Sequence, residues 1–337
     1  MAIEAARQAI VELPIDIQML RSLRETAKLL TTHYSTQIEG NRLTQAQVAE
    51  VITGEAGFSG ERFPGRERDE AEVKNYYQAL DYVESLAKQN DLIQEHDVKQ
   101  IHGLTFEGKP RPTPYRDGQN VIRDGRSGSI VYMPPEAHDV PNLMANLVDW
   151  INLNLEENEL PAPLIAGLAH YQFATIHPYY DGNGRSARLL ATLILHKSGY
   201  GLKGIYSLEK YYARNLEDYY EALNIGPSHN YDMGRSDSDV TKFVAYFCKG
   251  MAAAFGAVHA QAVKAAKRNG QDQSAWLKQL DPRERQLVAF LEKKGTANTD
   301  DIAKCLGLKT RTISTLCRGW IEKGLLKMHL LLGETER

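Results

Sequence analysis

The segment from 163 to 197 constrains the fold more than any other part of the chain. Apolar residues recur at spacings of three and four, which predicts an amphipathic helix over 163–176. Pro178 directly follows His177, and because proline cannot continue a helix, we expect the helix to end at His177. A second amphipathic stretch predicts another helix over 185–197. The segment therefore predicts two helices that are joined by a short turn.

The turn between these helices has the composition of an anion-binding site. Gly182, Asn183 and Gly184 precede the second helix, where open backbone N–H groups and the helix dipole favour negative charge. Arg185 and Arg188 are three residues apart on that helix, so two guanidinium groups are available for a polyphosphate. Two cations at a helix N-terminus are unfavourable by themselves, which indicates that an anion binds there.

Two further side chains of the turn suit proton and metal chemistry. His177 is the residue type for general-base catalysis near neutral pH. Asp181 supplies the hard oxygen ligand that Mg²⁺ prefers.

Residues 177–188, which read HPYYDGNGRSAR, resemble the motif of the Fic family. That motif is HPF, one variable residue, DGNGR, two variable residues and R. Tyr179 stands where the family usually has Phe, and its added hydroxyl needs a partner. The resemblance covers roughly 15–270 and includes the upstream stretches YRDGQNVI and YMPPEAHDVPNLMANLVDWIN.

The resemblance implies a protein adenylyltransferase, which moves AMP from ATP to a Ser, Thr or Tyr hydroxyl and releases pyrophosphate. It implies that His177 takes the proton from the target hydroxyl and that Asp181 binds a Mg²⁺ ion bridging the α and β phosphates. Relatives that act as kinases carry Lys in place of the second motif glycine, so Gly184 favours AMP transfer. The implied ATP- and phosphate-binding residues are Gly182, Asn183, Gly184, Arg185, Ser186, Ala187 and Arg188, the last of which binds the γ-phosphate.

Two other segments acquire a role from the resemblance. The run GSIVYMP over 128–134 predicts a β-hairpin, which the resemblance identifies as the flap that adds a strand of the target protein; the alternative is a plain structural hairpin. Its flap residues are Ser129, Ile130, Val131 and Tyr132. Tyr219 and Tyr220 lie where relatives form the adenosine pocket, although paired tyrosines on a helix are more often core residues.

An inhibitory element is predicted near the N-terminus. Ser35 to Gly40 (STQIEG) fits the pattern [S/T]xxxE[G/N] that many Fic proteins carry. Ser35 and Glu39 are four residues apart on one helix face, and Gly40 is a typical residue after a helix end. A carboxylate in the last turn opposes the dipole and should pair with a cation, for which Arg188 is the candidate. That pair would remove the γ-phosphate anchor and leave the resting enzyme largely inactive.

Two alternatives remain open for Glu39. The first is a solvated side chain before a glycine cap, without a regulatory role. The second is that Glu39 also positions water and so removes AMP from modified protein, as some relatives do.

The rest of the chain predicts a mainly α fold, a helical bundle with a small hairpin flap. Pro110, Pro112 and Pro114 exclude helix in the stretch that begins at Lys109, and the Gly-rich stretch 53–68 reads as a loop. Further helices are expected over 15–38, after Asn41, and over 69–89, 91–105, 139–156, 209–223 and 238–267.

The C-terminal part resembles a winged helix-turn-helix domain. Helices are predicted over 285–294, 299–306 and 309–322, with Gly295 and Thr299 as caps and 324–332 as the wing. The exposed face of the third helix would carry Lys309, Thr310, Arg311, Ser314 and Arg318. These side chains suit contact with DNA, although such modules also bind protein partners. The alternative function is therefore a nucleotide-sensing, DNA-binding transcriptional regulator.

Composition sets the domain limits and the setting. The chain has 337 residues, 42% of them hydrophobic and 25% charged, which fits two or three folded units. We expect a helical region over 1–110 with the inhibitory helix at about 15–40, a catalytic core over 111–267, a linker over 268–277 and the winged helix over 278–337. The net charge is −3, and residues 278–330 carry a local +5.

The expected setting is the cytoplasm, without membrane contact. Three cysteines at spacings that match no zinc or redox motif indicate reduced thiols. No run of about 18 uncharged apolar residues occurs, and Glu4 and Arg7 interrupt the start where a secretory leader would be apolar. The expected partners are ATP, a target protein, DNA and a second copy of the chain.

Overall fold

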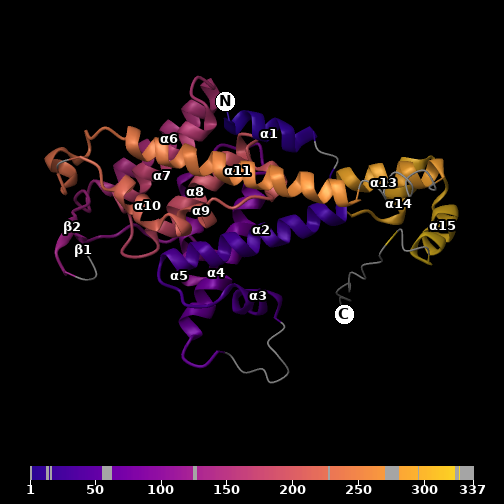
Figure 1. Ribbon diagram of the computed structural model, residues 1–337, viewed down its shortest axis with the longest axis horizontal. Helices are drawn as coiled ribbons and strands as arrows, with labels where there is room; N and C mark the ends of the chain where they lie inside the picture. The colour runs from indigo at the N-terminus through magenta and orange to yellow at the C-terminus, as the bar shows by residue number, and fades with distance from the viewer. Residues whose placement is uncertain are drawn as a thin grey trace, which may run out of the picture. The chain divides into compact units, whose positions relative to one another are not determined.

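The computed structural model describes residues 2–12, 15, 17–54, 63–123, 127–226, 228–269, 281–294, 296–322 and 326. The chain divides into an N-terminal unit, Met1–Val263, and a C-terminal unit, Lys264–Arg337 (Figure 1). Both are mainly helical, which confirms the expected fold class. The linker expected over 268–277 begins inside a helix, because Arg268 and Asn269 belong to α11, and 270–277 lie outside the described residues.

The N-terminal unit contains helices of varied length and two short strands. In chain order they are α1 (Ala2–Glu12), α2 (Ile17–Ile38), α3 (Gln45–Thr53), α4 (Glu67–Leu86), α5 (Glu95–Glu107), β1 (Ile122–Arg123), β2 (Ile130–Tyr132), α6 (Val140–Glu157), α7 (Ala162–Ile176), α8 (Asn183–Lys197), η1 (Leu202–Gly204), α9 (Glu209–Arg214), α10 (Leu216–Leu223), η2 (Tyr231–Arg235) and α11 (Thr241–Asn269).

The structure departs from the expected helix bounds at two places. Gln94 and Asp97 form a capping box, so α5 begins at Glu95 instead of Asp91. The helix expected over 209–223 breaks into α9 and α10 at Asn215, whose carbonyl accepts a hydrogen bond of 3.2 Å from the Tyr246 hydroxyl.

Helices α7 and α8 form the centre of the unit. They pack against each other, while α6 lies against α7, and α4 and α5 lie against α8. The apolar side of each helix is buried in one continuous core, with Phe173 and Ile176 from α7 and Leu189 and Leu193 from α8 completely enclosed. Helix α2 packs along α9 and against α4, which brings the N-terminal segment beside the central pair.

Helix α11 is long and apolar enough over Thr241–Val263 to cross a membrane by length and composition alone. Its apolar side chains have another explanation, because Phe243, Phe247, Met251 and Phe255 are completely buried in the core of the unit. A buried core helix meets the same criteria of length and hydropathy.

A hairpin is present at one end of the unit (Figure 1), but only its second strand lies in the expected run 128–134, because the first strand is Ile122–Arg123. Strands β1 and β2 pair antiparallel, with Ile122 opposite Tyr132. The residue after β2, Met133, pairs on its other side with 229–231, donating to the His229 carbonyl at 2.7 Å and accepting from the Tyr231 N–H at 3.0 Å. Part of the hairpin is therefore tied to the body of the unit.

The C-terminal unit has three described helices, α13 (Pro282–Lys294), α14 (Thr299–Leu306) and α15 (Thr310–Glu322). They enclose a small core of their own, which contains Leu287, Ile302, Ala303, Ile313 and Trp320. Gly307, at a φ of 65°, makes the turn between α14 and α15. This is a helix-turn-helix arrangement.

Of the two helix caps expected in this unit, one is replaced by a neighbouring residue and the other lies outside the described residues. Asn298, not Thr299, caps α14, because its side chain accepts from the Asp301 N–H in a capping box. Gly295 and the expected wing over 324–332, apart from Leu326, lie outside the described residues.

Candidate active site

The turn between α7 and α8 is held by its own backbone and by one side chain. His177 ends α7 in the left-handed region, at a φ of 51°, and Pro178 follows as expected. The Asn183 amide spans the turn, because its oxygen accepts from the Tyr179 N–H at 3.0 Å and its nitrogen donates to the Tyr179 carbonyl at 2.7 Å. With these two hydrogen bonds in place, α8 begins at Asn183, two residues before the expected position. The bonds use one of the two amide N–H groups of Asn183, and Asn183 itself is buried.

The proline-rich segment before β1 forms hydrogen bonds with the backbone of the turn through Arg116. Arg116 is buried and donates from Nε to the His177 carbonyl at 3.0 Å and from Nη2 to the Pro135 carbonyl at 2.5 Å. Its backbone N–H donates to the Pro178 carbonyl at 2.9 Å. One guanidinium therefore connects the catalytic turn to the base of the hairpin.

A second histidine, His102, packs against the turn and forms a hydrogen bond with its backbone. The His102 ring from α5 stacks on the Tyr179 ring, with centroids 3.5 Å apart and planes 5° apart. Its Nε2 donates to the Asp181 carbonyl at 2.9 Å, and its Nδ1 faces the Thr113 hydroxyl at 2.6 Å. Burial lowers the pKa of His102 to about 4, so the ring is neutral near pH 7. The Tyr179 hydroxyl meets no hydrogen-bond partner among the described residues, although its ring is firmly anchored.

The His177 imidazole has the electrostatics of a base. Its Nδ1 donates to the Ala174 carbonyl at 3.3 Å, which leaves the Nε2 lone pair as an acceptor. Burial lowers the pKa of His177 to about 4, and the bond to Ala174 opposes that shift only in part. The side chain is therefore unprotonated at neutral pH and able to take a proton.

Asp181 lies at the open side of the turn, with its side chain 47% exposed. Its carboxylate accepts from the Gly182 N–H at 2.5 Å and from Arg185 Nη2 at 3.3 Å, and Arg68 Nη2 lies 4.0 Å away. Among the residues that the structure describes, no three His, Cys, Asp or Glu side chains gather as a metal site. An accessible single carboxylate still fits Mg²⁺, which usually takes one or two carboxylates and completes its shell with water and phosphate oxygens.

Arg188 points from α8 into α2 and meets the predicted inhibitory residues. Its Nε donates to Ser35 Oγ at 2.9 Å, and its Nη2 donates to the Ser35 carbonyl at 3.0 Å and to Glu39 Oε1 at 2.8 Å. The guanidinium is fully buried, which by itself lowers the pKa of Arg188, but the Glu39 carboxylate together with Tyr219 and Tyr76 raises the pKa overall. The expected ion pair is thus present, and Gly40 follows it at a φ of 94°.

The Glu39 carboxylate also touches the glycine turn. A Cβ atom added to Gly184 would lie 2.6 Å from Glu39 Oε1 and 3.2 Å from Arg188 Nη1. The carboxylate therefore sits against the first turn of α8, where Gly182 caps the helix without a side-chain acceptor for its N–H groups. This is the position in which the sequence predicts a bound anion.

Some predicted site residues lie in the core. Ala187 is completely buried, which leaves its methyl group no route to a phosphate, and the buried Ser186 hydroxyl has no hydrogen-bond partner among the described residues. Tyr219 is also buried. It lies in an aromatic cluster, where its hydroxyl forms a hydrogen bond of 2.9 Å with His170 Nε2. Tyr220 is 49% exposed, so of the two tyrosines it is the one whose ring a nucleotide could reach.

Some of the predicted flap residues are exposed and others are buried. Ile130 is 41% exposed and Ser129 is also on the surface. Tyr132, in contrast, is buried and donates its hydroxyl to the Thr175 carbonyl at 2.6 Å. Its side chain therefore anchors β2 to α7 and does not face a target.

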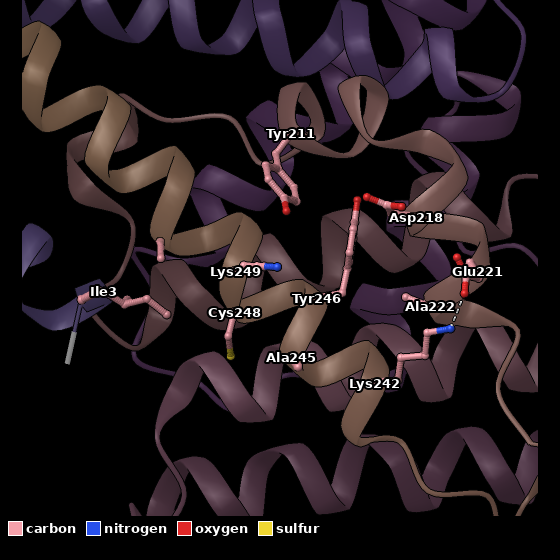
Figure 2. Close-up of a pocket in the computed structure, with 12 residues that line it drawn as sticks. Ile3, Tyr211, Asp218, Glu221, Ala222, Lys242, Ala245, Tyr246, Cys248 and Lys249 are labelled. Atoms are coloured by element: carbon pink, nitrogen blue, oxygen red, sulfur yellow. Dashed lines mark hydrogen bonds and ion pairs between the residues drawn. The ribbon is translucent and has the colours of Figure 1, made fainter.

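A separate hollow of about 730 Å³ lies between α1, α9, α10 and α11 (Figure 2). Tyr211, Tyr246 and Lys249 line it, and the Glu221–Lys242 ion pair of 2.7 Å crosses its edge. None of its lining residues belongs to the turn at 177–188. The hollow is therefore distinct from the candidate active site.

Comparison with known proteins identifies the domain that contains the turn. Residues 92–195, from the start of α5 through α8, match the Fic/DOC family. The turn at 177–188 lies within this match. The match is narrower than the span of 15–270 expected from resemblance, and it includes the histidine, both glycines and both arginines of the Fic motif.

Curated relatives of this Fic domain carry the name protein adenylyltransferase. One from Nematostella vectensis is 29% identical over 228 residues, which are 66% of this chain and 48% of the relative. One from Caenorhabditis elegans is 31% identical over 185 residues, 53% of this chain and 34% of the relative. The chain thus spans about half or less of the length of these relatives.

Solved structures agree on the fold. A Fic-domain-containing signalling protein from Bacteroides thetaiotaomicron superposes with a TM-score of 0.65 at 23% identity, over 79% of this chain and 97% of its own. A Fic family protein from Desulfovibrio desulfuricans covers 96% of this chain and 89% of its own, with a TM-score of 0.56 at 25% identity.

Sequence reasoning missed His102 and Arg116 as parts of the Fic site. Both reach the turn by hydrogen bonds to backbone carbonyls that lie 79 and 61 residues away in the chain. Helical periodicity carries no information about such contacts. An arginine inside a proline-rich loop, followed by Asp-Gly, was the one local signal available.

Proposed function

We propose that this protein is an adenylyltransferase that transfers AMP from ATP to a Ser, Thr or Tyr hydroxyl of another protein. The observation that carries the proposal is the neutral His177, whose Nε2 is free to accept a proton, at the edge of a glycine turn that starts α8. The adenylyltransferase names of the curated relatives support the same reaction.

The reaction follows from these groups. His177 Nε2 takes the proton of the target hydroxyl while its oxygen forms a bond to the α-phosphorus of ATP. The bond from that phosphorus to the bridging oxygen breaks, and pyrophosphate leaves. The N–H groups at the start of α8, together with Arg185 and Arg188, stabilise the phosphate charge. Asp181 would hold a Mg²⁺ ion, which would supply positive charge against the phosphates.

We propose that the flap presents the target. A strand of the target protein would pair with the edge of the hairpin near Ser129 and Ile130, which are exposed. Backbone pairing reads little sequence, so it suits a site that must accept a hydroxyl on an extended segment. Val131 lies between these contacts and the buried Tyr132.

We further propose that Glu39 holds the enzyme inactive. Its pairing with Arg188 takes the N–H that a γ-phosphate would use, and its carboxylate lies against Gly184. A triphosphate would meet like charge at that position, and its α-phosphate would be displaced from His177. The same carboxylate is positioned to orient water, which supports removal of AMP as a second activity.

The test is AMP transfer from labelled ATP by Glu39→Gly. Labelling of the protein itself or of lysate proteins should rise at least tenfold over wild type, and His177→Ala in that background should abolish it. Gln37→Gly places the same change at an exposed position two residues earlier and serves as the control. The proposal fails if labelling does not rise, or if it persists without His177.

AMP removal has its own test. Incubating AMP-modified target with wild type should release AMP, whereas Glu39→Gly should not. Equal release by both would exclude a role for Glu39 in hydrolysis.

A second function, DNA contact, is favoured by the face of α15. Arg311, Ser314 and Arg318 are exposed at spacings of three and four, opposite the buried Ile313 and Trp320. No acidic residue occurs from 302 to 321, while Lys304, Lys309 and both arginines do. Such a stripe suits the major groove of duplex DNA, and a regulator that senses nucleotide would combine both units.

Duplex binding by the full chain tests this function. Affinity should fall steeply with salt, and Arg311→Ala with Arg318→Ala should lower the salt slope by about two. Arg21→Ala with Arg24→Ala removes the same two charges from exposed positions on α2 and is the charge-matched control. No binding at low salt would reject DNA as the partner and favour a protein partner.

The proposal also includes a cellular location and an oligomeric state. The three cysteines have no disulfide partners among the described residues, which supports a reducing, cytoplasmic location. A homodimer without membrane contact is the assembly that we propose.

A further inference from the structure

Ser35 and Glu39 meet Arg188 in different ways. Ser35 supplies two acceptors, its hydroxyl to Nε and its carbonyl to Nη2, whereas Glu39 supplies one carboxylate oxygen to Nη2. Only the Glu39 contact borders Gly184, where an anion would bind. The Ser35 contacts therefore leave the phosphate side of the guanidinium open.

The two residues also differ in how firmly they are held. Ser35 is completely buried within α2. Glu39 lies one residue beyond the end of α2, and its side chain is 27% exposed. The backbone around Glu39 is fixed, because Glu39 and Asn41 both donate N–H groups to the Thr36 carbonyl and the Asn41 side chain donates to the Asp69 carbonyl. The Glu39 side chain can therefore rotate away while the helix stays in place.

Arg188 needs a partner after Glu39 has rotated. Its guanidinium is fully buried, and a buried cation without hydrogen bonds is strongly disfavoured. The Ser35 hydroxyl and carbonyl are the acceptors that remain among the hydrogen bonds to Arg188 in the described residues. They also fix the plane of the guanidinium, so that its free N–H groups point to the position that the carboxylate has left.

We infer that Ser35 is a positioning residue of the productive site, which orients Arg188 for the γ-phosphate of ATP once Glu39 has rotated away. This inference rests on the proposed function. It gives the two residues of one inhibitory pattern opposite roles: Glu39 blocks the nucleotide, and Ser35 prepares its anchor.

The sign of the Ser35→Ala effect tests the inference. In the Glu39→Gly background, Ser35→Ala should raise the KM for ATP about tenfold, because the charge-assisted bond to Nε is lost. Ser35→Thr in the same background should restore most of the loss. Ser35→Ala alone should not activate the enzyme. If it raises labelling toward the level of Glu39→Gly, Ser35 is only inhibitory and the inference is wrong.

A binding measurement separates this inference from the proposed reaction. Calorimetry on the Glu39→Gly protein should show ATP binding more tightly than ADP, and Ser35→Ala should reduce that ratio about tenfold without changing ADP affinity. An unchanged ratio would overturn the inference even if AMP transfer occurs. A reduced ratio in a protein that transfers no AMP would contradict the proposed reaction and still support the role of Ser35.

Matched variants control for folding. Thr32→Val removes a hydroxyl from α2 one turn earlier, at a completely buried position whose hydroxyl has no partner among the described residues, and should leave the ATP-to-ADP ratio unchanged. Ser35→Cys keeps the volume of the side chain but is a weak acceptor, so it should reproduce the loss if Ser35→Ala proves unstable. Thermal unfolding of each variant shows that it is folded.

Discussion

Burial disfavours the charged form of both residues on which the proposed chemistry depends, but their neighbours make the net results differ. It keeps His177 neutral by lowering its pKa to about 4, with the Ala174 carbonyl opposing the shift. It also disfavours the charge on Arg188, but the Glu39 carboxylate together with Tyr219 and Tyr76 raises the pKa of the guanidinium overall. A base and a cation can therefore coexist at one turn without neutralising each other's function.

The His177 titration can be measured directly. In the free protein its ring should become protonated with a midpoint near pH 4, because the buried imidazolium is poorly solvated. NMR titration of the histidine ring protons, with His177→Ala to assign the signal, gives this midpoint. A midpoint near the ordinary value of about 6.5 would mean that the ring is open to water.

Tyr179 offers a test of an unpaired polar group. Its ring stacks on His102, but its buried hydroxyl has no partner among the described residues. Tyr179→Phe should therefore leave the free energy of unfolding unchanged or raise it by up to about 1 kcal/mol. Tyr132→Phe, which removes a hydroxyl that bonds the Thr175 carbonyl, should lower it by about 1 kcal/mol. Urea unfolding compares them, and equal losses would show that the Tyr179 hydroxyl is satisfied.

At the scale of helices and strands, regular periodicity made most of the fold predictable. The amphipathic pattern and Pro178 correctly placed α7 and its end at His177. The break at Asn215, whose backbone has a φ of −124° and a ψ of 46°, was not predictable, because the apolar periodicity continues through residue 215. The motif made the turn predictable, whereas the contacts of His102 and Arg116 arise from segments that pack only in three dimensions.

The N-cap residue of α14, Asn298, allows a prediction about the stability of this helix. Asn298→Ala removes the acceptor for the Asp301 N–H and should destabilise α14 by about 1 kcal/mol. Hydrogen exchange of the α14 amides should accelerate about fivefold. The neighbouring Thr299→Ala changes a first-turn residue that does not cap and should have little effect. Comparable acceleration in both variants would contradict the assignment of Asn298 as the cap.

At the scale of the whole molecule, several histidines contribute to a common acid sensitivity. Burial lowers the pKa of His102 to about 4, of His170 to about 3 and of His196 to about 4, as it does for His177. The unfolded chain binds these protons near pH 6.5, whereas the folded chain does not until about pH 4. Acid therefore favours unfolding within that window.

Stability should follow this proton balance. Between pH 6.5 and 5.5 the free energy of unfolding should fall by roughly 1 kcal/mol for each of these histidines, and it should recover as the pH rises. Urea unfolding at several pH values measures the slope, and His196→Gln should reduce it by about one proton. A flat profile from pH 7 to 5 would show that the rings titrate normally in the folded protein.

The contact between Gly184 and Glu39 has a consequence for how such a protein can change by mutation. Any side chain at residue 184 would push the Glu39 carboxylate away from the start of α8. A genetic screen for constitutive activity should therefore recover substitutions at Gly184 as well as at Glu39. The inhibition can be lost in a single step, through either residue of this contact.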